Sequence, residues 1–155
     1  MRRLRAFWAA EPSVRILLLE AFLLPLFIRA CFSLTGASRT QGWLRRWAFR
    51  RQIRSPGPGP QAWIRHAIGA QRAVNALTGL GGSCLVRSFT LWTLLLRRGV
   101  ATDLRVGFRK HEGEIEGHAW LEFDQSPVNE PAATIKTYFP YSKPAAFDDW
   151  RRMAR

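Results

Sequence analysis

The chain has 155 residues, of which 47% are hydrophobic and 12% aromatic, a composition that suits one folded domain and excludes a disordered tail. Its two cysteines, Cys31 and Cys84, are too few for a disulfide scaffold and lack zinc-ligand spacing, so we expect free thiols in a reducing compartment and neither a metal nor a cofactor. The net charge of +13 comes from residues 1–102, whose 16 arginines against two acidic residues indicate an anionic partner or solvated helix faces.

Helical periodicity dominates the N-terminal part of the chain. The first helix is predicted to begin at 11–13 and to run to about Leu24, where Pro25 predicts a kink or a break. A second, shorter helix is predicted over 41–54, with tryptophans on one face and arginines on the other. The alternating prolines and glycines of 55–60 then predict a linker, because they remove backbone donors and disfavour regular structure.

The apolar stretch 14–34 is the one segment that resembles a membrane anchor. Arg15, Glu20 and Arg29 interrupt it, and charged side chains near the centre of a bilayer are costly, so no spanning helix is predicted. The basic start of the chain is not followed by an apolar run with a small-residue cleavage site, which argues against a signal peptide. We therefore expect a cytoplasmic protein, with peripheral contact to the inner face of the membrane as an additional expectation.

Two further helices have clear boundaries in the sequence. Pro60 suits the first turn of a helix that carries an apolar stripe and ends at Gly79. Ser83 is the expected N-cap of the next helix, 84–98, and Gly99 follows its basic last turn as the expected C-terminal cap. This second helix is the best-defined element of the chain.

After Gly99, apolar and polar residues alternate, which is typical of half-buried strands. The expected segments are a strand over 104–108, a turn at 110–113, a strand over 115–123, a turn at 124–127, a short strand about 128 and another about 135–139. Helices followed by consecutive strands predict an α+β fold, with the Cys84-bearing helix packed on an antiparallel sheet. We divide the chain into a basic N-terminal helical region, 1–59, and a core, 60–155, that together form one compact unit.

Three residues form a candidate catalytic constellation. Cys84 is the candidate nucleophile, because unpaired backbone N–H groups and the dipole at a helix N-terminus favour the thiolate. His118 is the candidate base, and Glu130 is the candidate carboxylate that orients its ring. An antiparallel hairpin centred on Asp124 would set Glu130 opposite His118, provided that the loop has an odd number of residues. In the plainer interpretation, Cys84 and His118 are core residues and Glu130 is a surface acid.

Five short runs carry a resemblance to a known family. They are 84–88 (Cys-Leu-Val-Arg-Ser), 94–100 (Leu-Leu-Leu-Arg-Arg-Gly-Val), 104–107 (Leu-Arg-Val-Gly), 118–122 (His-Ala-Trp-Leu-Glu) and 128–130 (Val-Asn-Glu). In these runs the chain resembles the lasso-peptide B-type leader peptidases, transglutaminase-like cysteine proteases that remove the leader from a ribosomally made precursor. The similarity covers roughly residues 60–131, and the N-terminal helices match more loosely.

The resemblance implies a transglutaminase-like (papain-like) fold and a Cys–His–Asp triad, whose first two members fall on Cys84 and His118. The third position falls on Glu130, so this chain offers Glu where the family has Asp. Because Glu is one methylene longer, Asn129 and Asp124 stay open as alternatives for the residue that orients the imidazole.

The function implied by the resemblance is a cysteine endopeptidase that cuts a lasso-peptide precursor at the leader–core junction before macrocyclisation. The chain resembles the stand-alone form of the protease, so the expected partners are the precursor, a separate small leader-recognition protein and the macrocycle synthetase, without nucleic acid. Two alternatives stay open. One is a transglutaminase-like acyl transferase that uses Cys84 and His118, and the other is a basic helical module that binds nucleic acid or membrane, with Cys84 inert.

Overall fold

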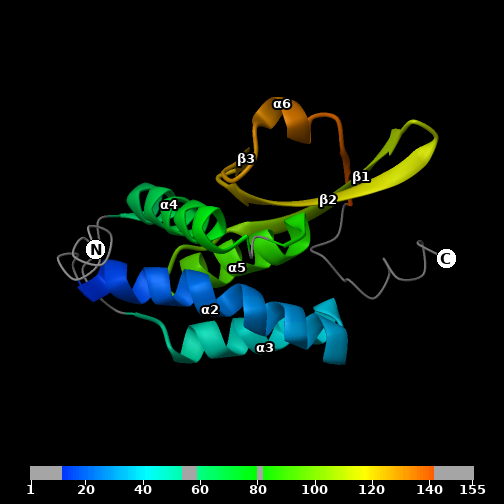
Figure 1. Cartoon of the computed structure of the whole chain (residues 1–155). Helices are drawn as coiled ribbons and strands as arrows, with labels where there is room; N and C mark the ends of the chain where they lie inside the picture. Colours follow the sequence, from blue (N-terminus) through cyan, green and yellow to red (C-terminus); the bar gives the residue numbers. More distant parts are fainter. Residues whose placement is uncertain (1–11, 54–58, 80–81, 142–155) are drawn as a thin grey trace.

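The computed structural model describes residues 12–53, 59–79 and 82–141. Four helices come first: α2 (Pro12–Thr35), α3 (Ala37–Arg50), α4 (Pro60–Thr78) and α5 (Cys84–Leu96). They are followed by β1 (Asp103–His111), β2 (Glu114–Phe123), β3 (Ser126–Pro127), α6 (Ala132–Ile135) and β4 (Phe139–Pro140), whose strands form one antiparallel sheet in the order β3-β2-β1-β4. Figure 1 shows α2, α3, α4 and α5 on one side of the sheet and α6 on the other. The predicted α+β class is confirmed.

The first helix is longer than predicted. α2 continues through Pro25 to Thr35, so the predicted end at about Leu24 is wrong, and of the kink or break expected at the proline the break is wrong. A proline inside a helix removes one backbone hydrogen bond and costs about 3 kcal/mol. Here that cost is offset by burial, because Leu24, Pro25 and Ile28 all lie on the buried face of α2. Tertiary packing therefore overrides the local preference of proline.

The boundaries between the helices follow from glycine. Gly36 has φ of 80°, a conformation that ends α2, and its carbonyl accepts the Thr40 hydroxyl at 2.8 Å in the first turn of α3. As a result α3 begins several residues before the predicted 41. Gly79 and Gly99, with φ of 65° and 71°, occupy the left-handed positions expected after α4 and α5. The predicted linker 55–60 falls mostly outside the described residues.

α5 lies at the centre of the hydrophobic core. All of its residues from Ser88 to Leu96 are buried, and it contacts α2, α3, α4, β1 and β2. A single hydrophobic cluster combines side chains from every large element, among them Leu17, Ala21 and Ile28 of α2, Leu44 and Ala48 of α3, Ile64, Ala67 and Val74 of α4, Phe89, Leu91, Leu94 and Leu95 of α5, Leu104 of β1 and Leu121 of β2. The core therefore crosses the expected boundary at residue 59, and the division into two regions stays a prediction.

A buried ion-pair cluster joins the middle of α2 to the end of α5. The carboxylate of Glu20 binds the guanidinium groups of Arg97 and Arg98, the second at 2.9 Å. The Arg98 side chain is only 1% exposed, and it also donates to the Leu94 carbonyl at 2.9 Å. Burial lowers the pKa of Arg98, while the neighbouring Glu20 carboxylate opposes that shift. Glu20 is thus the counter-ion that allows a guanidinium to lie in the core.

Both hairpins of the sheet have two-residue loops. Glu112 and Gly113 join β1 to β2, Asp124 and Gln125 join β2 to β3, and all four residues have positive φ. Positive φ at both central positions is the signature of a type I′ turn, whose twist matches that of antiparallel strands. The second loop is even in length, which pairs Glu122 with Pro127. The odd-loop register expected to set Glu130 opposite His118 is therefore wrong.

The chain after β2 also differs from the prediction. β3 consists of Ser126 and Pro127 alone, and Val128 follows it in a bend. The strand expected about 135–139 is instead the short helix α6 and the two-residue strand β4. Pro131 starts this helical turn, and its carbonyl accepts the N–H of Ile135 at 3.2 Å. Alternation over so few residues did not separate a strand from a single turn of helix.

The two faces of the β1–β2 hairpin have different roles. Leu104 and Leu121 are paired across the strands and join the core cluster. His118 and Trp120 lie on the opposite face, because neighbouring residues of a strand alternate between faces. Gly107 is paired with His118, and a Cβ there would lie 2.8 Å from the Trp120 ring and 3.0 Å from the Phe139 carbonyl. Glycine at this position therefore makes room for the indole next to His118.

Candidate active site

Cys84 is the first residue of α5, as predicted. The Ser83 side chain caps the helix by accepting the Val86 N–H at 3.4 Å, and the first intrahelical bond runs from Arg87 N–H to the Ser83 carbonyl at 3.1 Å. The N–H groups of Cys84 and Leu85 precede that bond, so they point out of the helix N-terminus, where the dipole favours negative charge. The thiol is partly exposed, whereas the other cysteine is buried in the core.

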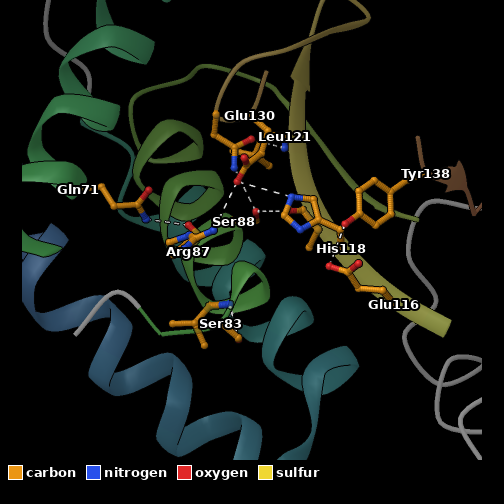
Figure 2. A network of polar contacts seen from close by, with 12 residues as sticks. Gln71, Ser83, Arg87, Ser88, Glu116, His118, Leu121, Glu130 and Tyr138 are labelled. Carbon is orange, nitrogen blue, oxygen red and sulfur yellow. Dashed lines mark hydrogen bonds and ion pairs between the residues drawn. The ribbon is translucent and has the colours of Figure 1, made fainter. Parts of the chain in front are cut away.

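His118 lies in β2 between aromatic neighbours. Its side chain is 14% exposed, and its ring stacks on Tyr138 at 5.1 Å between centroids and on Trp120 at 6.4 Å. Figure 2 shows the rings of His118 and Tyr138 side by side, with Glu130 near the imidazole. The tryptophan is 1% exposed, so it supports the histidine ring from within the protein. Packing of this kind restricts the orientations that the imidazole can take.

α5 is attached to β2 next to His118. The Ser88 hydroxyl donates to the Ala119 carbonyl at 2.8 Å, and this bond is buried. It joins the second turn of the cysteine helix to the residue that follows the histidine. Cys84 and His118 are thus carried by two elements that pack directly against each other.

Glu130 lies beside His118 without being paired with it in the sheet. The Glu130 Oε1 lies 3.6 Å from His118 Nε2, an ion-pair distance when the ring is protonated. The Val128 N–H donates to the Leu121 carbonyl at 3.0 Å, which turns the chain back along β2 after the hairpin. The carboxylate is therefore beside the imidazole even though the register that was expected to place it there does not occur.

Arg87 also binds Glu130. Its Nη2 donates to the same carboxylate oxygen at 3.5 Å, so Oε1 lies between a guanidinium of α5 and the imidazole of β2. Arg87 follows Cys84 by three residues, a spacing that places both on one side of the helix. Arg87 was not expected at the site from the sequence, although its spacing of three residues from the cysteine was a usable signal.

The other two residues considered for orienting the imidazole are placed differently. The Asn129 side chain links α5 to β2: its Oδ1 accepts the Leu121 N–H at 2.7 Å, and its Nδ2 donates to the Ser88 hydroxyl at 3.3 Å. Both ends of this amide are thus used in holding the two elements together. Asp124 lies in the hairpin loop with φ of 48°, six residues along the strand from His118, which is about 20 Å at the rise of a β-strand.

Tyr138 is a site residue that sequence reasoning missed. Its hydroxyl donates to Glu116 at 3.2 Å, and the Arg109 guanidinium lies over its ring at 4.7 Å. Burial and then the hydrogen bond to Glu116 raise the pKa of Tyr138, and the charge of Cys84 also raises it. Tyr138 therefore joins the His118 ring to the Arg109 and Glu116 side chains of the β1–β2 hairpin. No local pattern marked it, because it lies in a loop distant in sequence from these residues.

The two residues that contact Tyr138 from the β1–β2 hairpin, Arg109 and Glu116, also form an ion pair with each other. Arg109 binds Glu116 Oε2 at 2.7 Å across the β1–β2 ladder, where the two residues are directly opposed. The hydrogen bond from Arg109 holds the pKa of Glu116 below its usual range. Among the described residues, no group of three or more His, Cys, Asp or Glu side chains is placed to bind a metal ion.

Comparison with known proteins assigns a family to this arrangement. A family model described as the transglutaminase-like superfamily matches residues 31–143, well over half of the chain. The chain belongs to the transglutaminase-like superfamily. Members of this superfamily are typically cysteine proteases or acyl transferases. No curated protein and no solved structure matches the chain.

The two thiols of this transglutaminase-like protein should differ in reactivity. Burial raises the pKa of Cys31, which is 7% exposed, so less thiolate is available there at any given pH. Cys84 is partly exposed at a helix N-terminus. Under native conditions and at mildly acidic pH, we expect iodoacetamide to modify Cys84 at least tenfold faster than Cys31. Peptide mapping by mass spectrometry gives both rates, and equal labelling would support an inert Cys84.

Proposed function

We propose that the protein is a cysteine endopeptidase that removes the leader from a lasso-peptide precursor before the core is macrocyclised. The observation that carries the proposal is the 3.6 Å contact between His118 Nε2 and Glu130 Oε1, on a strand packed against the helix that begins with Cys84. Membership of a superfamily of cysteine proteases and acyl transferases supports the cysteine chemistry. The choice of a leader peptide as substrate depends on the sequence runs around these residues.

In the proposed first step, the Cys84 thiolate attacks the carbonyl carbon of the scissile peptide bond. Because Nε2 lies beside Glu130, we assign the other ring nitrogen of His118, Nδ1, to partner the sulfur in this step. The protonated imidazole then gives its proton to the leaving nitrogen, so the peptide C–N bond breaks and a thioester forms as the C-terminal fragment departs as a free amine. The outward N–H groups at the start of α5 would bind the oxyanion that develops.

In the second step, water replaces the amine. His118, now neutral, takes a proton from the water as its oxygen attacks the thioester carbon. The C–S bond breaks, the leader leaves as a carboxylic acid that loses its proton to the solvent, and the thiolate–imidazolium pair is restored. Each turnover thus consumes one water and one peptide bond, and needs no other reactant.

Arg87 explains how a glutamate could orient the imidazole at the position where the related family has aspartate. The longer side chain has one more rotatable bond, and its carboxylate must be held in place to orient a ring. Arg87 binds the oxygen that faces His118, and the Glu130 side chain is only 19% exposed. In the proposal, Arg87 is therefore a positioning residue that acts through Glu130.

The role of Glu130 is testable with an isosteric change. Glu130→Gln keeps the size of the side chain and removes its charge, so we expect kcat/KM for precursor cleavage to fall about ten- to a hundredfold, less than on loss of the nucleophile. Kinetics by liquid chromatography of the products measure the effect. Glu114→Gln, at the exposed start of β2, is the matched control and should leave kcat/KM unchanged. Equal rates for the Glu130→Gln protein and wild type would exclude an orienting role.

The proposed reaction itself is tested by the masses of the products. The protein is incubated with a lasso-peptide precursor and its leader-recognition protein, and we expect one cut that gives a leader ending in a free carboxylate and an intact linear core. A leader joined to an added amine would instead show an acyl transferase with the same thioester chemistry. An uncut precursor, with a recognition protein shown to bind it, would contradict both enzyme assignments.

A further inference from the structure

The outward side of α2 carries several large, exposed apolar residues. Successive helical residues are separated by about 100°, so positions three, four and seven apart share one side. Six large apolar residues lie there with 39% to 57% of their surface exposed, and together they form what we call the α2 apolar face: Ile16, Leu19, Phe22, Leu23, Leu26 and Phe27. A patch of this kind on a folded protein marks a surface that another body covers.

The opposite side of α2 is fixed in the protein. Leu17, Ala21 and Ile28 are at most 1% exposed in the core, and Glu20 is bound to the buried Arg98. α2 is the one helix of the described chain that is long and apolar enough to cross a membrane, and a third of its most apolar window is buried inside the protein. Crossing a bilayer would break these contacts, whereas lying along its surface would keep them.

The surroundings of this face are basic. Residues 12–53, which form α2, α3 and the turn after it, contain seven arginines and a single acidic residue, Glu20. Because Glu20 is turned inward to Arg97 and Arg98, no carboxylate from this segment offsets the outward arginines. Such a surface attracts an anionic partner and repels a cationic one.

α3 packs along α2 (Figure 1) and carries exposed aromatic residues of its own. Trp43, Trp47 and Phe49 are between 38% and 52% exposed. A shallow hollow of about 380 Å³ is lined by two of them and by arginines: Trp43, Arg46, Trp47, Arg50 and Arg51. Tryptophan favours the boundary between lipid head groups and acyl chains, and arginine binds phosphate in two-point geometry.

We propose that the α2 apolar face rests on an anionic membrane, with the helix in the plane of the surface. Its leucines and phenylalanines would enter the boundary between head groups and acyl chains, and the arginines of α2 and α3 would bind lipid phosphates. A lipid surface suits this side better than a protein does, because in residues 12–53 exposed apolar and cationic groups come together and the one carboxylate, Glu20, is bound to Arg97 and Arg98. The inference concerns where the protein acts, so it stands independently of the proposed cleavage.

Vesicle sedimentation tests the proposal directly. The purified full chain is mixed with vesicles of pure phosphatidylcholine, or of phosphatidylcholine with about a quarter of phosphatidylglycerol. We expect binding to the anionic vesicles to be at least tenfold stronger and to weaken as salt is raised. Leu23→Glu places a carboxylate at a position that is 57% exposed in the middle of the face, and should weaken this binding at least tenfold.

The matched control is Leu77→Glu. This leucine is also helical and 63% exposed, but it belongs to α4, so vesicle binding should equal that of the wild type. Precursor cleavage without vesicles should be the same for both variants, which separates failure of the membrane proposal from failure of the proposed reaction. Two vesicle results would overturn the proposal: the wild type does not bind anionic vesicles, or Leu23→Glu binds them as strongly as the wild type does. It would also be overturned if the wild type binds no vesicles but forms a stoichiometric complex with a protein, and Leu23→Glu loses that complex.

Discussion

Replacing Cys84 with alanine should abolish precursor cleavage. The sulfur is the attacking atom of the proposed reaction, and removal of a nucleophile costs about 10⁴- to 10⁶-fold in kcat for enzymes of this kind. Cys84 is partly exposed at the N-terminus of α5, so little packing is lost with it and the fold should persist. Single-turnover assays with chromatographic detection give the rate, and circular dichroism on heating gives the stability.

His118→Ala should have a similar effect, because the thiolate then loses the group that holds and returns its proton. The two losses should not add in the double variant, since both residues act in one step.

Cys31→Ala is the matched cysteine control. It removes the other sulfur, which lies on the buried face of α2. The substitution should therefore cost some stability and leave the cleavage rate intact. Cleavage at the wild-type rate by the Cys84→Ala protein would refute the assignment of the nucleophile.

The largest effect on stability is expected for Glu20→Ala. Glu20 is 11% exposed, Arg98 is 1% exposed, and removal of the carboxylate leaves that guanidinium charged in the core without its counter-ion. Breaking one partner of a buried ion pair costs about 3–5 kcal/mol, which for a chain of this size corresponds to a fall of roughly 10 °C in Tm. Calorimetry or a urea titration measures it.

Glu116→Gln is the comparison for this experiment. It breaks the ion pair with Arg109, but Glu116 is 46% exposed, and solvent screens such pairs, so the fall in Tm should be much smaller. Equal Tm values for Glu20→Ala and wild type would show that water reaches Arg98 and that the cluster contributes nothing to the fold.

Local signals in the sequence located the main elements of the candidate site. Ser83 caps a helix by a short-range contact, Gly99 has the positive φ that ends a helix, and alternating residues after it form β1 and β2. These features depend on neighbours a few residues away, so they can be inferred without knowing the fold. Cys84 at the start of α5 and His118 within β2 are therefore placed where they were expected, while their roles in catalysis stay predictions.

Contacts between distant segments decided the rest. The even loop at Asp124 moved the register away from the one expected, yet Glu130 still faces His118, because Val128 and Asn129 bond to Leu121 and return the chain along β2. A difference of one residue in the length of a loop decides on which face of the sheet each later side chain lies. The composition of the loop does not determine that length.

The sequence by itself determined the class of fold, the helix that starts with Cys84 and the strand that carries His118. Only the tertiary structure decided that α2 runs through Pro25, that Glu20 neutralises Arg98, and that Tyr138 stacks on the histidine. The physical reason is range. Helix caps, turns and strand alternation depend on interactions between residues close in sequence. Burial and ion pairing depend on which distant segments meet after the chain has folded.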